Sequence, residues 1–296
     1  MPFPALAFAT PRKLPSAREL DGRVVVLDLA FAAEGTGTSF DKVTKRFIDG
    51  LGSRLALWVD HHDHELHAEY KKDPRFILAT KAEHGACPEM ITPELVARAG
   101  KVDTVVCHGD FDGLASAAKW IRGGTEPYVG ADADARAIDT RIGKPGKLAL
   151  TIDRALRARP KDDALKGLIV RFLSEGGTDR GLLAELETAA LSMQRLEEAA
   201  AMLAKRYEVH EDAGVAVCDA RGANVFYDKT ELLLMGQEKA KISVVYDDVT
   251  VTMAAAFDSG VDFLRLLEIG GGMPTRVSVP ASRLDEVLTR LGVRSR

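Results

Sequence analysis

The stretch VDTVVCHGDFDGLASAAKWIRGG (residues 102–124) predicts a buried strand, a polar turn and a helix in direct succession. Its first six residues are mostly β-branched or apolar, as in a strand, and its last two glycines are typical of a helix end. Between them, HGDFDG (108–113) places a histidine and two aspartates where the strand ends. In open α/β sheets, ligands bind in the crevice at the carboxyl ends of the strands.

Two earlier apolar stretches end in the same kind of residue. RVVVLDLAF (23–31) contains Asp28, and RLALWVD (54–60) ends in an aspartate that two histidines follow. If the three strands are parallel neighbours, their acids and imidazoles converge on one place. Further strands are predicted at 75–80 and 125–132, with helical periodicity between strands, for example over 39–52. The pattern predicts an α/β fold with a mainly parallel sheet flanked by helices.

The rest of the chain predicts a second, smaller α/β domain. Residues 178–206 are rich in Ala, Leu, Glu and Lys, with apolar residues three and four positions apart, which predicts a linker helix. Short apolar stretches and an amphipathic helix at 282–293 follow. We therefore predict a first domain over 1–177, a helical linker over 178–206 and a second domain over 207–296.

The composition of the 296-residue chain is ordinary for a globular protein, with 46% apolar and 28% charged residues. No apolar run is long enough to span a bilayer, and the start lacks the features of a signal peptide. Three widely spaced cysteines form no disulfide framework, so we expect a cytoplasmic protein. The net charge of −4 argues against a binder of long duplex nucleic acid, which needs a basic face.

The clustered acids favour bound metal ions. Neighbouring carboxylates raise one another's pKa unless a cation compensates them. Mixed carboxylate and imidazole ligands suit Mn²⁺, Fe²⁺ or Zn²⁺, whereas Ca²⁺ prefers oxygen ligands alone. Alternatives without metal binding stay open. Asp112 could act only as the N-cap of its helix, and His61 and His62 could be ordinary surface histidines. We expect Cys107 to pack in the core.

Three other histidines are expected to lie outside this chemistry. His64 and His67 follow the strand end within HHDHELH, and we expect them to be solvated. His84, in KAEHGACPEM, is expected to be structural.

These motifs resemble those of the DHH phosphoesterases. Val59-Asp60-His61-His62 is similar to the family signature, and HGDFDGLASAA (108–118) resembles its aspartate-rich first motif. Asp28 resembles the family's second motif, a single acid that bridges the metals. IGGGMPTRVSVP (269–280) resembles the glycine-rich turn of the DHH-associated domain, which closes over the substrate. The resemblance spans nearly the whole chain.

Three features depart from the family pattern. The aspartate-rich turn follows the DHH strand instead of preceding it, which suggests a circularly permuted strand order. Met273 stands where the family has a histidine after three glycines. Ala254 stands where the family usually has an arginine that meets the substrate, and either Arg276 or Lys241 could replace it.

The resemblance implies a site with two divalent metal ions, Mn²⁺ before Mg²⁺, Fe²⁺ or Zn²⁺. It assigns the metal ligands to Asp28, His61, His108, Asp110, Asp112 and a late aspartate, for which Asp139 is the best match and Asp132 and Asp134 are rivals. It further implies that Asp60 orients the ligand imidazole and that His62 contacts the phosphate or the leaving group. Substrate binding is expected at Gly270, Gly271, Gly272 and Arg276.

The function that follows from the resemblance is metal-dependent phosphodiester hydrolysis. The expected substrates are short oligonucleotides or cyclic dinucleotides, as for nanoRNase or RecJ-like proteins. The first domain would then be catalytic and the second would bind substrate. Two alternatives remain: a phosphomonoesterase acting on bisphosphorylated adenosine, and a nucleotide-binding protein without turnover. A membrane partner is not expected, and a homodimer is compatible with the sequence.

Overall fold

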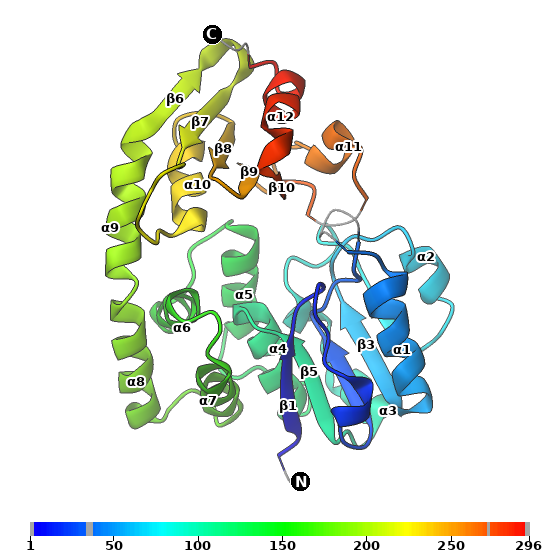
Figure 1. Ribbon diagram of the computed structural model, residues 1–296. Coiled ribbons are helices and arrows are strands. Elements are labelled where there is room, and N and C mark those ends of the chain that lie inside the picture. The colour runs from blue at the N-terminus through cyan, green and yellow to red at the C-terminus, as the bar shows by residue number, and fades with distance from the viewer. Residues whose placement is uncertain (1–2, 34–37, 271–272, 294–296) are drawn as a thin grey trace. The chain divides into compact units, whose positions relative to one another are not determined.

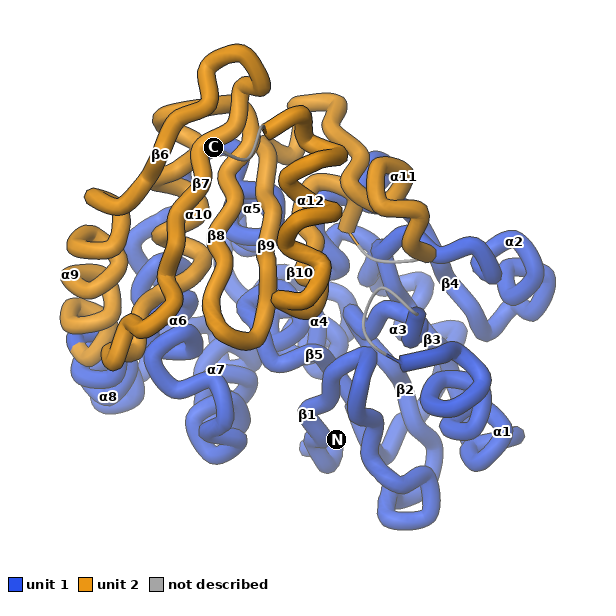
Figure 2. Tube along the Cα trace, turned by 45° about the horizontal axis from the view of Figure 1, so that its top comes forward, with its two compact units in different colours: residues 1–191 blue, residues 192–296 orange. Residues whose placement is uncertain are grey.

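The computed structural model describes residues 3–33, 38–270 and 273–293. The chain divides into two compact units, residues 1–191 and 192–296 (Figure 2). The division falls inside the segment predicted as a helical linker. That segment forms two helices instead of one, α8 (Arg180–Leu191) in the first unit and α9 (Gln194–Leu203) in the second. Within the described ranges, none of the helices has the length and apolar content that a membrane crossing requires.

The first unit is built on a five-stranded sheet in the order β1-β5-β2-β3-β4 (Figure 1). All neighbouring strands in it are parallel. The strands are β1 (Ala5–Ala9), β2 (Val24–Leu27), β3 (Leu55–Asp60), β4 (Phe76–Leu78) and β5 (Thr104–His108). The predicted α/β class is confirmed. The strand before the HGDFDG turn also lies beside β2, and β2 lies beside β3, as the three motifs require.

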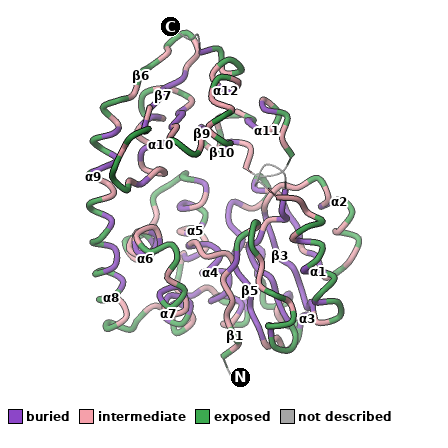
Figure 3. The backbone as a smooth tube through the Cα atoms, viewed as in Figure 1, coloured by how far each residue is buried: buried purple, intermediate pink, exposed green. Residues whose placement is uncertain are grey.

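Both faces of this sheet are covered, which explains the unbroken apolar run in β2. Val25 and Leu27 enter one core, Val24 and Val26 enter the other, and all four are fully buried. Figure 3 shows the neighbouring strands β3 and β5 as mostly buried too. A parallel sheet buried on both faces needs apolar residues at every position.

The first core is closed by six helices, α3 (Pro93–Ala99), α4 (Phe111–Ile121), α5 (Ala131–Thr140), α6 (Lys147–Ala158), α7 (Asp163–Ser174) and α8. On the other face lie α1 (Arg46–Leu51), which follows a π-helical turn at Asp41–Lys45, and the short α2 (His67–Tyr70).

The strand predicted at 125–132 is wrong. Residues 125–130 consist of irregular backbone, bends and a turn, and α5 begins at Ala131 after Gly130, whose φ is +89°. The carboxylate of Glu126 accepts hydrogen bonds from the backbone N–H groups of Gly130 and Asp132. These bonds satisfy donors at the start of a helix whose alanine-rich sequence favours the helical state.

The second unit has a mixed five-stranded sheet in the order β10-β9-β8-β7-β6. Its strands are β6 (Tyr207–His210), β7 (Val215–Asp219), β8 (Ile242–Tyr246), β9 (Thr250–Ala255) and β10 (Arg276–Pro280). Helices α9 and α10 (Lys229–Gln237) cover one face. The other face is covered by α11 (Phe263–Leu267) and α12 (Leu284–Arg290).

Gly113 sets how closely α4 can start beside β5. A Cβ at this position would lie 2.6 Å from the carbonyl oxygen of His108. We expect Gly113→Ala to lower the free energy of unfolding by about 1–3 kcal/mol, since backbone must move to relieve the clash. Chemical denaturation of the purified protein measures this.

Gly167, inside α7, is the matched control, because a Cβ there meets nothing within 4 Å. Gly167→Ala should raise the free energy of unfolding by roughly 0.5–1 kcal/mol through helix propensity. Equal stability of Gly113→Ala and the wild type would contradict the packing argument.

Candidate metal centre

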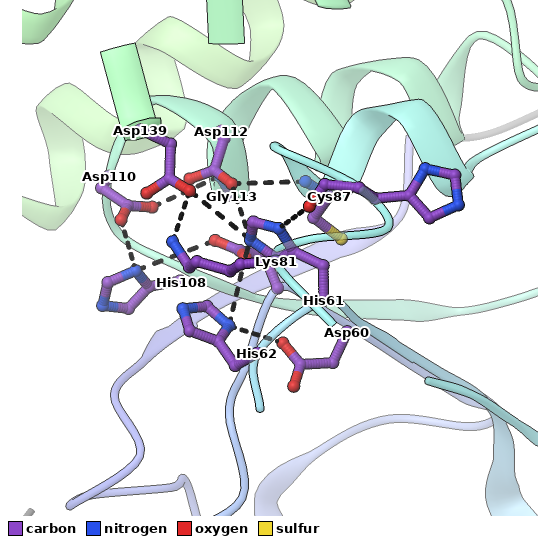
Figure 4. A network of polar contacts seen from close by, with 12 residues as sticks. Asp60, His61, His62, Lys81, Cys87, His108, Asp110, Asp112, Gly113 and Asp139 are labelled. Atoms are coloured by element: carbon purple, nitrogen blue, oxygen red, sulfur yellow. Dashed lines mark hydrogen bonds and ion pairs between the residues drawn. The ribbon is translucent and has the colours of Figure 1, made fainter. Parts of the chain in front are cut away.

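The carboxyl ends of β2, β3 and β5 bring the predicted ligands together (Figure 4). His61 follows β3 and is fully buried. Its Nε2 atom lies 3.1 Å from Asp28 Oδ1, 3.3 Å from Asp112 Oδ2 and 3.8 Å from Asp139 Oδ2. Residues far apart in the sequence thus surround one imidazole nitrogen.

Asp28 lies between two imidazoles. Its Oδ1 faces His61, while its Oδ2 lies 3.8 Å from Nδ1 of His108. His108 also contacts Asp110, with 2.7 Å between Nδ1 and Oδ2. Asp28 has a φ of +54°, in the left-handed region that residues with a Cβ seldom occupy. Strained backbone of this kind is concentrated at functional sites.

Helix capping does not explain Asp112. The N-cap of α4 is Asp110, whose side chain accepts a hydrogen bond from the N–H of Gly113 at 3.3 Å. Asp112 lies in the first turn, is buried, and directs Oδ2 toward His61. The two aspartates of HGDFDG therefore have different positions: one caps the helix beside His108, and the other enters the buried cluster.

The two histidines of the DHH tripeptide are oriented by different groups. Nδ1 of His61 lies 2.9 Å from the carbonyl oxygen of His84, so this nitrogen carries the proton and Nε2 is left for the cluster. Asp60, predicted to orient His61, instead contacts Nδ1 of His62 at 2.8 Å. His84 was expected to be structural, and the group that orients His61 is its backbone carbonyl.

Lys81 is a member of the cluster that no sequence motif predicted. It lies just past the end of β4, is buried, and its ammonium pairs with Asp139. Burial lowers its pKa, but the carboxylates of Asp139, Asp112 and Asp28 outweigh burial and raise it. The signal was available, because Lys81 follows the predicted strand at 75–80 much as the acids follow theirs.

Of the three late aspartates, Asp139 is the one that faces His61. Asp132 pairs with Lys119. Asp134 accepts hydrogen bonds from the hydroxyl of Tyr128 at 2.9 Å and the N–H of Gly146 at 2.7 Å.

The prediction that His67 is solvated is wrong. Its side chain is buried, with its ring edge-on to Phe31 at 5.2 Å between centroids. Burial lowers its pKa to about 4, so it is neutral at physiological pH. His64 is half-buried beside Phe31 as well. Both imidazole rings therefore pack against Phe31 in the aromatic cluster of the first unit.

Within the described residues no cysteine sulfur belongs to a candidate ligand group, although the backbone N–H of Cys87 donates to Oδ2 of Asp112 at 3.4 Å. Cys107 packs in the core as expected, and Cys87, whose Sγ donates to the carbonyl oxygen of Val59, is buried in the same core. Burial raises the pKa of both thiols well above the usual value, so they stay protonated. Cys218 in the second unit is buried too.

The predicted substrate residues belong to the second unit. Gly270 is exposed, as is Arg276, whose guanidinium donates a hydrogen bond to Oγ1 of Thr230 at 3.0 Å. Gly271 and Gly272 lie outside the described residues.

The electrostatics of the first-unit cluster fit bound cations. Burial, followed by the charges of Asp112 and Asp110, raises the pKa of Asp28 well above its usual value. Burial lowers the pKa of His61 and His108, but neighbouring carboxylates outweigh it and raise them to about 11 and about 10. Protons therefore accumulate here to compensate the buried negative charge, which is what a metal ion would otherwise do.

Unpaired polar atoms in the cluster also fit bound cations. Among the described residues, both carboxylate oxygens of Asp28 and Nε2 of His61 find no partner in hydrogen-bond geometry. Buried polar atoms are nearly always paired, so these three atoms fit the coordination of a cation. Three sets of side chains each bring three ligand atoms within 4.8 Å of one another: Asp28, His61 and His62; Asp28, His108 and Asp110; and His61, Asp112 and Asp139. Asp28 belongs to two sets and His61 to two.

The chain resembles the DHH phosphoesterases. The DHH tripeptide, the HGDFDG turn and the acid after β2, on which the resemblance rests, lie side by side. No model of a known family matches the chain, and no curated protein does.

Two solved structures match most of the chain at low sequence identity. One is PggH, a pGpG-specific phosphodiesterase from Vibrio cholerae, with 10% identity and a TM-score of 0.49 over 93% of this chain and 100% of that one. The other is an exopolyphosphatase-related protein from Bacteroides fragilis, with 12% identity and a TM-score of 0.47 over 98% of this chain and 92% of that one.

Asp28→Asn tests whether the cluster is built for ions. Without metal, the variant should melt at a higher temperature than the wild type at pH 8. The raised pKa of Asp28 means that its folded state binds a proton more tightly than its unfolded state does, so this group's contribution to stability falls as pH rises above the usual aspartate pKa. Asparagine is neutral at any pH and avoids this loss.

With Mn²⁺ the order should reverse. The wild type should gain stability from bound ions, whereas Asp28→Asn should gain little, because it lacks the carboxylate shared by two ligand sets. Melting scans with EDTA and with MnCl₂ measure both effects. Equal Mn²⁺ stabilisation of the two proteins would rule out Asp28 as a ligand.

Proposed function

We propose that the chain is a metal-dependent phosphodiesterase that hydrolyses short oligonucleotides or cyclic dinucleotides. The observation that supports this best is the position of Asp28, whose two carboxylate oxygens face His61 and His108 on either side. An acid in this position can be shared by two ions. Proposed ligands are Asp28, His61, His108, Asp110, Asp112 and Asp139, with Mn²⁺ the favoured ion.

Divalent ions bound here would supply positive charge that polarises a phosphate ester and lowers the pKa of water. The protein's own contribution is to hold the ligands rigidly. His61 is fixed through the carbonyl of His84, and Asp112 through the first turn of α4. Such outer contacts set ligand orientation in metal sites.

His62 is the residue best placed to meet the substrate. Unlike His61 it is partly exposed, with 22% of its side chain accessible. The Asp60 carboxylate can only accept a hydrogen bond, so Nδ1 of His62 donates to it and Nε2 is available to a phosphate or leaving group. Burial raises the pKa of Asp60, but His62 more than offsets this, and the net shift is downward. Asp60 therefore stays ionised and remains the hydrogen-bond acceptor that holds Nδ1 of His62.

In the second unit we propose that Arg276, together with Gly270–Gly272, contacts the substrate. Arg276 is the cross-strand partner of Ala254 in the β9–β10 pair, so the two side chains leave the same face of the sheet. An arginine beside position 254 supplies the charge that the family usually provides from that position. Lys241 does not belong to either strand of this pair.

The decisive experiment is incubation with Mn²⁺ and a panel of phosphate esters. Expected products are nucleoside monophosphates from a 5′-phosphorylated dinucleotide or from cyclic dinucleotides, with turnover abolished by EDTA. Release of inorganic phosphate from 3′-phosphoadenosine 5′-phosphate alone would favour a monoesterase. Binding of nucleotides without any product would favour a binding protein.

His62→Ala should lower kcat by about 100-fold or more, because general acid–base residues typically contribute 10²–10⁴. Its metal content, measured by elemental analysis, should match the wild type. His210→Ala in β6 is the control for loss of an imidazole and should retain full kcat. Wild-type kcat in His62→Ala would remove that residue from the mechanism.

Arg276→Ala should raise KM for a dinucleotide by about tenfold with kcat little changed, as loss of one charged contact of about 1.4 kcal/mol implies. The exposed Arg265 offers a matched control, and Arg265→Ala should leave KM at the wild-type value. If both variants show the same KM, β10 does not bind substrate through Arg276.

A further inference from the structure

A pocket of about 500 Å³ lies beside the metal centre within the first unit. It opens where β1 and β5 end, and it shares His108, Gly109 and Asp110 with the HGDFDG turn. A small molecule in this pocket would therefore lie next to the bound ions. The buried side chains around His61 that are proposed to bind those ions would stay in place. The other residues that line the pocket are not among the predicted site residues.

Those walls combine apolar and cationic side chains. Phe8, Leu14 and Pro15 line one part, and Lys13 and Lys166 bring two ammonium groups. Ligand pockets commonly have this composition, with a mostly apolar lining and a few charged groups that fix orientation. Next to a phosphoesterase centre, it fits a molecule with both an apolar ring system and an anion.

Lys166 is built into the pocket wall. The residue is buried, and its Nζ lies 2.8 Å from Asp163 Oδ1 and 5.6 Å from the centre of the Phe8 ring. Its aliphatic stem packs against Gly109, where a Cβ would come within 2.9 Å of Cε. Glycine at position 109 thus makes room for this lysine beside the metal-binding turn.

Lys13 is placed by a tight turn directly after β1. Its N–H donates to the carbonyl of Thr10 at 2.9 Å, and the N–H of Thr10 donates to the carbonyl of Lys13 at 3.2 Å. Its side chain is exposed and lines the pocket. Of the acids nearby, Asp163 is paired with Lys166, and Asp110 belongs to the proposed ion-binding set. With ions bound, the charge left facing the pocket is positive.

We propose that this pocket binds the part of the substrate beyond the scissile phosphate, a nucleoside carrying its own phosphate. The phosphate lies beside Lys13 and Lys166, and the nucleoside lies against Phe8 and Leu14. The inference rests on the proposed function and deepens it: it assigns recognition of the second nucleotide to Lys13, Lys166 and Phe8 of the first unit.

The kinetic test compares a 5′-phosphorylated diadenylate with bis(p-nitrophenyl) phosphate, which has no second phosphate. In Lys13→Ala, and in Lys166→Met, which keeps the stem over Gly109, the ratio of kcat/KM for the two substrates should fall about tenfold. The change should lie mainly in KM for the dinucleotide. Exposed Lys161, next to Pro160 but outside the pocket, is the charge-matched control, and Lys161→Ala should keep the wild-type ratio. Wild-type ratios in both pocket variants would overturn the proposal while the proposed function stands.

A binding test does not depend on turnover. Titration of Mn²⁺-loaded protein with a non-hydrolysable 5′-phosphorylated diadenylate, whose bridging oxygen is replaced by methylene, should show about tenfold weaker binding in Lys13→Ala and Lys166→Met. Adenosine, which has no phosphate, should bind all proteins alike. Equal weakening for adenosine, or no dinucleotide binding by the wild type, would refute a phosphate contact in this pocket. Absence of Mn²⁺-dependent hydrolysis with intact lysine-dependent binding would instead refute the proposed function.

Discussion

Burial of several carboxylates in one place is the constraint on which the first unit depends. Asp28 and Asp112 are almost fully buried and close to one imidazole, and Asp139 and Asp110 lie at the edge of the same cluster. Such a group is costly unless positive charge compensates it. The protein compensates part of it internally through Lys81 and the imidazoles, and we attribute the remainder to metal ions. Stability and function are therefore opposed at this one point.

The parallel sheet makes this concentration of charge feasible. Adjacent parallel strands end at the same edge, so β2, β3 and β5 deliver their polar residues together, whatever their order along the chain. The sequence was sufficient to predict these strands because each is a continuous apolar run, and sufficient to predict the cluster because each run ends in an acid or a histidine. The buried sheet and the buried charges thus come from the same three segments.

Other features could not be predicted from local pattern. The carbonyl that orients His61 belongs to His84, and a backbone group gives no sequence signal. The strand β1 consists of Ala-Leu-Ala-Phe-Ala, without β-branched residues, and is fixed by its pairing with β5. His67 looked polar in a polar stretch, yet the aromatic core beneath it excludes water. In each case a tertiary contact outweighs the local propensity.

The burial of all three cysteines has a practical consequence. Thiol reagents attack exposed, ionised thiols, and Cys87, Cys107 and Cys218 are neither. Cysteines introduced on the surface could therefore carry fluorophores or spin labels without prior removal of the native ones. One label in each unit would report how the distance between the units responds to ions and nucleotides in solution.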